Sequence, residues 1–206
     1  MKKVKAITVF LSIFFIVSVA GVIEGMMHEK GTGMIDKGKE MLEEKVAEVT
    51  GEVQLERPVG YREWIYVGTP VTPNDMNDGK AAFPEFHNVY INPESYKEYK
   101  KTGKFRDGTL MVKELVNVGA KSATSGNGYF QGDFIGLEVA MKDSKQFPKE
   151  PGNWGYFSFT NPAGELKNKA TAFPTASCNA CHEAAAEDDL VFIQYYPVLR
   201  AAKAMK

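Results

Sequence analysis

The segment "GTLMVKELVNVG" (Gly108–Gly119) shows the clearest alternation of side chains in the chain. In an extended strand, successive side chains point to opposite faces of the sheet. One face of this segment therefore carries Met111, Lys113 and Leu115. The other face carries Leu110, Val112, Glu114 and Val116. The pattern predicts a strand bounded by glycines, with one lysine set between two apolar side chains.

Further strands are predicted on both sides of this segment. "FHNVYI" (Phe86–Ile91) alternates in the same way, and "NWGYFSFT" (Asn153–Thr160) is rich in aromatic residues. "SGNG" (Ser125–Gly128) predicts a tight turn that leads into Tyr129–Lys142, which is either one strand or a bulged pair of strands. Short strands joined by such turns indicate an antiparallel sheet.

Two helical regions accompany the strands. "NPESYKEYKKTG" predicts a short helix with Asn92 as its N-cap, Pro93 as its first residue and Gly103 as its end. Residues Ser177 to Ala204 are predicted to be helical except around Pro197. The fold class is therefore α+β: an antiparallel β-sheet with a few flanking helices and a C-terminal helical segment.

The N-terminal region predicts export from the cytoplasm. Early lysines precede an uncharged apolar run, Ala6–Ile23. This is the pattern of a signal peptide over residues 1–20, with small residues suited to cleavage after Ala20. The run is also about long enough to remain as a membrane anchor to about residue 23. In both cases the remainder is expected on the far side of the membrane, which in a bacterium is the periplasm.

Composition bounds the rest of the chain. Residues 21–55 predict a linker with a spacer helix, because Leu42, Val46 and Val49 recur at helical spacing among many Lys and Glu residues. Residues 56–206 are expected to form a single domain. The formal net charge is −1, which gives no electrostatic reason to expect nucleic acid as a partner.

The only two cysteines lie near the C-terminus, in "ASCNACHEA" (Ala176–Ala184). Three interpretations of Cys178, Cys181 and His182 compete. A Cys-x-x-Cys-His unit is the attachment motif of haem c, in which both thiols bind the haem and the histidine is an axial iron ligand. A redox disulfide of the thioredoxin kind would follow a core strand of a βαβ unit, and none precedes Cys178. A zinc site would need further ligands, and the other histidines are distant. Haem c is the favoured interpretation.

The position of the motif near the C-terminus limits which residue could be a second axial ligand of the iron. A methionine ligand would come from Met76, Met111 or Met141, and none of them has a distinguishing context. The alternatives are an iron open on one face and a six-coordinate haem of an electron carrier. We expect the open face.

At this point the chain resembles a known family, cytochrome P460, whose relatives include the β-sheet cytochromes c′. The resemblance runs from about Tyr61 to Ala204 and rests on segments that follow one another in the same order, among them "YREWIYVGTPVTPNDMNDGKAAFPEFHNVYINPESYKEYKKTGKFRDGT", "VKELVNVGAK", "SGNGYFQGDFIGLEVAMKDSKQFPKEPGNW" and "PTASCNACHEA". It implies a dimeric antiparallel-sheet fold with one five-coordinate haem c. It also implies oxidation of hydroxylamine, and often of nitric oxide.

The resemblance gives Lys113 a role that its pattern alone does not. Members of the family join a lysine covalently to a carbon of the porphyrin, and Lys113 in "LMVKELV" is the matching residue. From the pattern alone, a desolvated nucleophilic amine and a surface lysine on a strand edge are both open, and the surface lysine is favoured. A relative without the lysine would resemble the gas-binding β-sheet cytochromes c′. The presence of Lys113 favours an enzyme.

A group that takes protons from the substrate is harder to place. His87 could be a distal proton acceptor, an iron ligand or an ordinary strand histidine, and it points to the face opposite Phe86. Asp133, Glu138 and Glu85 are candidate carboxylates, none of them marked by a motif.

The motif and the export signal predict a periplasmic mono-haem c protein with Cys178 and Cys181 as thioether ligands and His182 on the iron, and the family resemblance implies that it is an oxidoreductase with Lys113 cross-linked. Its substrate would be hydroxylamine, or nitric oxide, converted to nitrous oxide or nitrite. A soluble cytochrome c would accept the electrons, and the protein would be a homodimer. The alternatives are a non-catalytic protein that binds nitric oxide and a simple electron-transfer cytochrome c.

Overall fold

The computed structural model describes Met41, residues 52–174 and residues 176–204. The chain separates into two units, Met1–Val46 and Ala47–Lys206, and the second contains every element described below. The predicted signal peptide and most of the predicted linker lie outside the described residues. Within the described residues, no helix is both long enough and apolar enough to cross a membrane.

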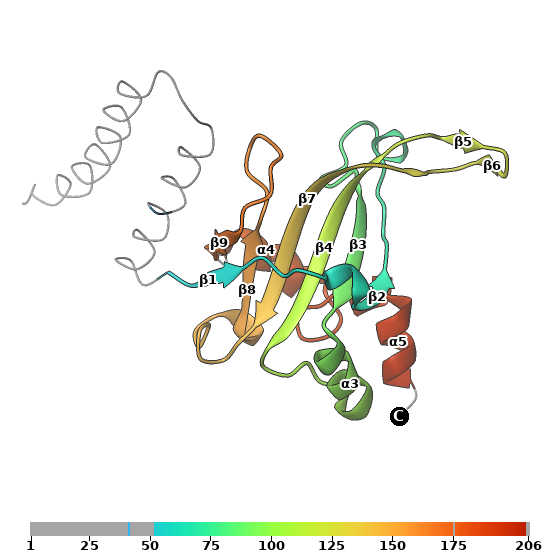
Figure 1. The fold of residues 1–206 in the computed structure, drawn as a ribbon. Coiled ribbons are helices and arrows are strands. Elements are labelled where there is room, and N and C mark those ends of the chain that lie inside the picture. Colours follow the sequence, from blue (N-terminus) through green and yellow to red (C-terminus); the bar gives the residue numbers. More distant parts are fainter. Residues whose placement is uncertain (1–40, 42–51, 175, 205–206) are drawn as a thin grey trace, which may run out of the picture. The chain divides into compact units, whose positions relative to one another are not determined.

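The centre of the domain is a five-stranded antiparallel sheet with the order β2-β3-β4-β7-β8 (Figure 1). The strands are β2 (Ile65–Gly68), β3 (Phe86–Ile91), β4 (Thr109–Val118), β7 (Gln131–Lys142) and β8 (Trp154–Ser158). The predictions of a strand at Gly108–Gly119 and at Phe86–Ile91 are confirmed. Tyr129–Lys142 contains one strand, β7, whose register against β4 shifts near Val116.

The register of the sheet defines its two faces. Lys113 of β4 lies opposite Val89 of β3 and opposite Glu138 of β7, and Glu138 lies opposite Ser158 of β8. We call the side of the sheet that carries these four residues the helix face. The side that carries Val112, Glu114 and Leu137 is the ribbon face.

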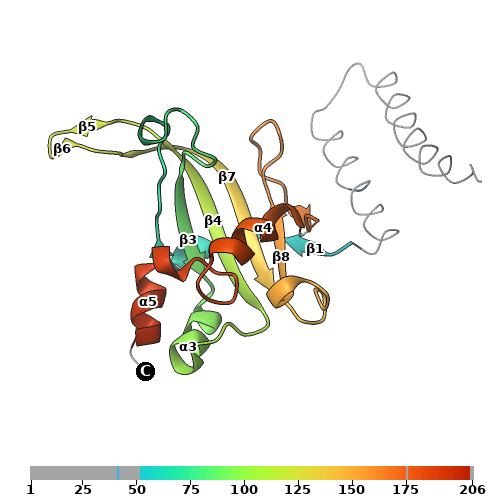
Figure 2. The ribbon, with the colours of Figure 1, turned by 180° about the vertical axis from the view of Figure 1, so that it is seen from behind.

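Each face is covered by a different part of the chain. Helices α3 (Pro93–Thr102), α4 (Ala176–Ala185) and α5 (Pro197–Ala204) belong to the helix face, and Figure 2 shows α4 in front of the sheet. Their apolar side chains share a core with the sheet that includes Tyr99, Met111, Trp154 and Leu199. The ribbon face packs against the two-stranded ribbon of β1 (Gln54–Glu56) and β9 (Lys169–Thr171). The predicted α+β class is confirmed.

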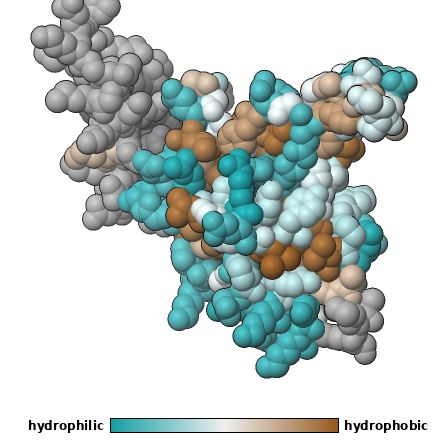
Figure 3. Space-filling model, turned by 45° about the vertical axis from the view of Figure 1, so that its right-hand side comes forward, coloured by the Kyte–Doolittle hydropathy of each residue, from teal (hydrophilic) through white to brown (hydrophobic). Residues whose placement is uncertain are grey.

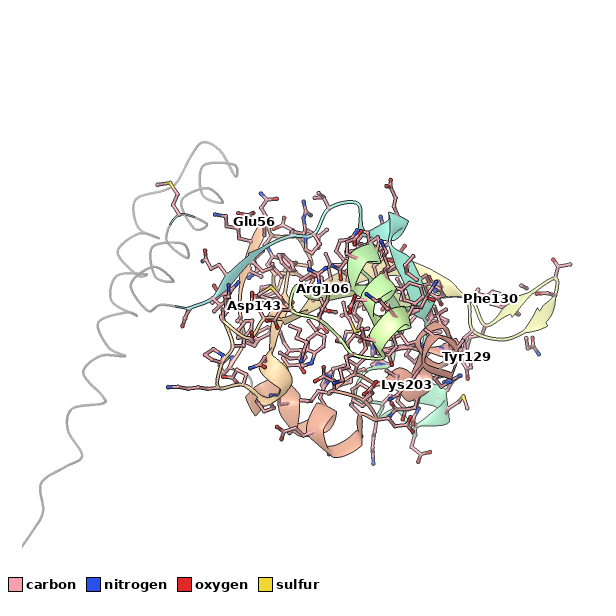
Figure 4. The ribbon with its side chains drawn as sticks, turned by 90° about the horizontal axis from the view of Figure 1, so that it is seen from below. Glu56, Arg106, Tyr129, Phe130, Asp143 and Lys203 are labelled. Carbon is pink, nitrogen blue, oxygen red and sulfur yellow. The ribbon has the colours of Figure 1, made fainter. Side chains whose placement is uncertain are left out.

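A hairpin arm projects from the far end of β4 and β7 (Figures 1 and 4). Its strands are β5 (Ser122–Ala123) and β6 (Gly126–Asn127). The arm is tied to the 3-10 turn η2 (Asn74–Met76) through Asp75, which accepts hydrogen bonds from Lys121 Nζ at 2.7 Å and Tyr129 Oη at 3.0 Å. Figure 3, in which the right-hand side of Figure 1 comes forward, shows that hydrophobic residues interrupt the hydrophilic surface of the domain.

The predicted N-cap of α3 is confirmed: Asn92 holds that position, although its side chain makes no capping hydrogen bond and instead donates to Gly108 O at 3.1 Å and accepts from Leu110 N of β4 at 2.9 Å. The C-terminal helix prediction was wrong in extent. The chain leaves the helical conformation after α4 and Pro197 begins α5, because proline suits the first turn of a helix.

The remaining short elements are 3-10 turns. They are η1 (Tyr61–Glu63), η3 (Pro151–Asn153) and η4 (Ile193–Tyr195). The turn η4 lies between α4 and α5, and Ile193 in it is buried in the core of the helix face. The segment between the two helices is therefore packed against the sheet.

Candidate functional site

The Cys-x-x-Cys-His unit lies on α4, on the helix face of the sheet. Residues three and four apart are neighbours on a helix surface, so Cys178, Cys181 and His182 share one side of α4. Both thiols are free. Cys178 is half-buried and packs against the core, whereas Cys181 is exposed.

His182 is held in one tautomer. Its Nδ1 lies 2.7 Å from the carbonyl oxygen of Leu190. A carbonyl only accepts, so Nδ1 carries the proton and Nε2 is left with a free lone pair. Burial lowers the pKa of His182, which keeps the imidazole neutral. A neutral imidazole whose other nitrogen donates to a carbonyl is the usual state of a metal-binding histidine.

Two aromatic rings flank the imidazole. The ring centroid of Tyr156 lies 4.9 Å from that of His182, and the ring centroid of Phe192 lies 4.8 Å from it. Tyr156 comes from β8 and Phe192 from the segment between α4 and α5. The sheet and the C-terminal segment together therefore fix the plane of the ring.

The geometry does not favour the two other interpretations of the motif. Burial, with a smaller contribution from Glu138, raises the pKa of the Cys178 thiol, whereas a thioredoxin-type centre depends on a lowered thiol pKa. A structural zinc site needs about four ligands. No group of three or more His, Cys, Asp or Glu residues in the described part of the chain is placed to hold a metal ion. Haem attachment is the interpretation that the geometry leaves.

Lys113 lies on the same face of the sheet as α4. Its side chain is 29% exposed, and its Nζ lies 2.6 Å from Glu138 Oε2 and 5.7 Å from the centre of the Phe83 ring. The amine is therefore not alone among apolar side chains, as its sequence neighbours suggested, but paired with a carboxylate. The charges of Lys113 and Glu138 also act on the pKa values of Cys178 and His182, after the larger effect of burial, which places all four residues in one electrostatic environment.

His87 belongs to this face as well, since it lies opposite Leu115 in the register. Its Nε2 lies 3.2 Å from Glu85 Oε1, and its ring centroid lies 6.0 Å from that of Phe83. Burial first, and then the charge of Lys113, lowers the pKa of His87. His87 is thus a neutral imidazole near neutral pH, with a carboxylate beside it.

Phe83 is a site residue that the sequence did not reveal. It precedes β3 in a stretch without periodicity, and its side chain contacts both His87 and Lys113 although it is 55% exposed. Three residues expected as candidates lie elsewhere. Asp133 is exposed near the start of β7, Met76 is exposed in η2, and Met141 is buried on the ribbon face. Met111 is buried in the core of the helix face.

Unpartnered polar groups provide a test of whether a haem fits this site. The hydroxyl of Tyr156 and both amide atoms of Asn179 are buried and have no hydrogen-bond partner. Buried polar groups are normally paired, because an unpaired one costs free energy. Tyr156 contacts His182, and Asn179 lies between Cys178 and Cys181 on α4. Two thiols, a neutral imidazole and unpartnered polar groups beside them fit a covalently held haem with polar substituents.

The fold and these residues define a class of protein: an antiparallel-sheet domain that carries a haem c attachment motif on a C-terminal helix. The family model described as Cytochrome P460 matches residues 58–193. The chain therefore belongs to the cytochrome P460 family, as the sequence resemblance indicated, and is a haem c protein of that family. A comparison with curated proteins finds no significant match.

Proposed function

We propose that this protein is a haem c oxidoreductase that oxidises hydroxylamine to nitrous oxide or nitrite, and also oxidises nitric oxide to nitrite. The observation that carries the proposal is the position of Lys113 on the helix face, with Glu138 at 2.6 Å and within the electrostatic environment of Cys178 and His182. A lysine on the ribbon face could not reach a haem held by α4, because the sheet would lie between them.

Cys178, Cys181 and His182 would hold the haem. Each thiol would form a thioether with one vinyl group of the haem, its sulfur bonding one vinyl carbon and its hydrogen passing to the other. His182 would bind iron through Nε2, because Nδ1 is occupied by Leu190. When bound, the haem supplies the redox chemistry, and the protein supplies ligation, electrostatics and access.

Lys113 would form a further bond to a porphyrin carbon. Such a bond would replace a C–H bond of the porphyrin with a C–N bond, so two electrons would have to pass to an external oxidant such as a peroxide. The amine would have to lose a proton first, and Glu138 Oε2, at 2.6 Å, is the group placed to hold the amine and to relay that proton to solvent.

Proton acceptors for the substrate would come from the same face. Hydroxylamine loses protons as it is oxidised, and a general base must lie within hydrogen-bond reach of them. His87 is neutral and backed by Glu85, and Glu138 is a carboxylate partly open to solvent. These two groups are the proposed acceptors, and Phe83 would shield them from bulk water.

The cellular setting is part of the proposal. The apolar N-terminal run supports export to the periplasm, the compartment in which haem c is attached. A soluble cytochrome c would accept the electrons, and the protein would act as a homodimer, as the family resemblance implies.

The optical spectrum of the reduced protein tests the function. A Soret band displaced well to the red of ordinary haem c is expected from the lysine cross-link. Lys113→Ala should abolish both this displacement and hydroxylamine oxidation while the haem stays attached. Wild-type turnover by Lys113→Ala would sink the mechanism. An ordinary five-coordinate spectrum of the wild type would indicate a protein that binds nitric oxide, and a six-coordinate low-spin spectrum an electron carrier.

A further inference from the structure

The turn after α4 has an unusual backbone. Asp188 and Val191 face each other across it, and Val191 N donates to Asp188 O at 2.8 Å. Its two central residues have positive φ angles, 45° at Asp189 and 60° at Leu190. Positive φ at both central positions is the pattern of a type I′ turn, which normally uses Gly, Asn or Asp. Leucine is disfavoured there, so the surroundings must hold this conformation.

Lys142 provides one of these constraints. It lies at the end of β7, on the helix face, and its side chain is only 14% exposed. Its Nζ lies 2.9 Å from Asp189 Oδ2 and 3.2 Å from Asp189 Oδ1. The same Nζ also bonds the carbonyl of Gly152 and lies 5.4 Å from the centre of the Trp154 ring. The carboxylate of Asp189 is thus fixed to the sheet.

The backbone of the turn is fixed on the same side. Trp154 Nε1 donates to Asp189 O at 2.8 Å. A Cβ atom placed on Gly152 would come within 2.9 Å of Asp189 Oδ1 and of Leu190 Cδ1, so the turn packs directly against this glycine. The next carbonyl along the chain is that of Leu190, which accepts from His182 Nδ1 at 2.7 Å.

We propose that Lys142 and Asp189 are positioning residues for His182. By fixing the Asp188–Val191 turn, they hold the Leu190 carbonyl against Nδ1 of His182. This contact sets the orientation of the imidazole and the strength with which its Nε2 lone pair would bind iron. This rests on the proposed function of His182 as the axial ligand of the haem iron. Hydrogen bonds to the second nitrogen of a metal-binding histidine fix its ring and raise its basicity. A freer turn would lengthen the hydrogen bond from His182 Nδ1 to Leu190 O and weaken the donation of the Nε2 lone pair to iron.

The test uses the full-length haem-loaded protein in its reduced state. Resonance Raman spectroscopy measures the iron–histidine stretching band, and a redox titration measures the midpoint potential. Lys142→Met keeps the length of the side chain and removes its charge. Asp189→Asn removes the charge while keeping a residue that tolerates positive φ. In both variants we expect the band to move to lower frequency and to broaden, and the midpoint potential to become more positive.

The matched control is Lys121→Met, which removes an ion pair of similar length, with Asp75, on the hairpin arm. Its band and midpoint potential should equal those of the wild type. A band that stays in place in both Lys142→Met and Asp189→Asn overturns the inference while leaving the proposed ligation intact. Absence of any iron–histidine band in the wild type overturns the assignment of His182 itself, and the inference with it.

Discussion

The Nζ atom of Lys113 lies 2.6 Å from the Oε2 atom of Glu138, and the two residues are directly opposite each other on β4 and β7. The strand register therefore places a carboxylate beside the one lysine that the family resemblance connects with the porphyrin. The pair is partly exposed, with 29% of the Lys113 side chain and 37% of the Glu138 side chain open to solvent. Its significance is chemical more than energetic.

Glu138→Gln should distinguish a role of this ion pair in forming the cross-link from a contribution to stability. Partly exposed ion pairs contribute less than about 1 kcal/mol to the free energy of unfolding, so stability should change little. The fraction of cross-linked haem should fall, because no carboxylate remains to take the proton of Lys113. The displaced Soret band and the mass of the haem-bearing peptides measure this fraction. Glu94→Gln, an exposed glutamate of α3, is the control and should leave it unchanged. Full cross-linking in Glu138→Gln would remove Glu138 from the mechanism.

The three proposed covalent attachments can be counted by substitution. Replacing Cys178 or Cys181 with alanine should remove a thioether bond, and the haem retained after acidic solvent extraction measures the bonds that remain. With both cysteines replaced, we expect haem that resists extraction to be held by Lys113. Adding Lys113→Ala to this double variant should release all of it. Haem that still resists extraction from the triple variant would show an attachment point other than these three.

The hairpin arm should loosen in acid. The hydrogen bond from Lys121, with a smaller one from Tyr129, lowers the pKa of Asp75 below its ordinary value of 3.8. A lowered carboxyl pKa in the folded state contributes stability that is complete above 3.8 and is lost as the pH falls through the lowered value. The protection of the arm's backbone amides against hydrogen exchange, relative to an unfolded chain at the same pH, should therefore fall only on the acid side of 3.8. Asp75→Asn should exchange faster at neutral pH and lack this acid transition; a transition retained in that variant would assign it to another group.

Gly155 of β8 should not tolerate a side chain. A Cβ atom there would collide with the ring of Phe147, which is buried against the sheet on the ribbon face. Forcing additional atoms into a packed core costs about 1–3 kcal/mol, so Gly155→Ala should lower the midpoint of chemical denaturation accordingly. Gly128→Ala is the matched control, because its added Cβ would meet only Phe130 at 3.8 Å. Equal stability of the two variants would show that Phe147 moves aside freely.

Local patterns in the sequence were sufficient for most of the elements. Alternation gave β3 and β4, and Pro93 and Gly103 gave the ends of α3, because these signals depend only on residues close together in the chain. The C-terminal region was less predictable. The turn at Asp189 and Leu190 is held by Lys142 and Trp154, and no local signal reports such distant partners.

The residues of the candidate site likewise divide into those that the sequence reveals and those that only the structure reveals. Cys178, Cys181 and His182 are adjacent in sequence, so their motif could be recognised without a structure. Glu138 was one of three equal candidates until the register put it opposite Lys113. Phe83 gave no signal, since an aromatic residue in an irregular loop shows its role only through the side chains that it contacts.

The sequence by itself determined the α+β class, the haem c motif and the alternation that separates Lys113 from Glu114. These follow from the period of a strand and from the spacing of adjacent ligands, which are properties of the local chain. Only the tertiary structure decided which face of the sheet α4 covers, which carboxylate pairs with Lys113 and which carbonyl holds His182. Those choices depend on strand register and on the packing of segments far apart in the chain, where contact is made in space and leaves no pattern in sequence.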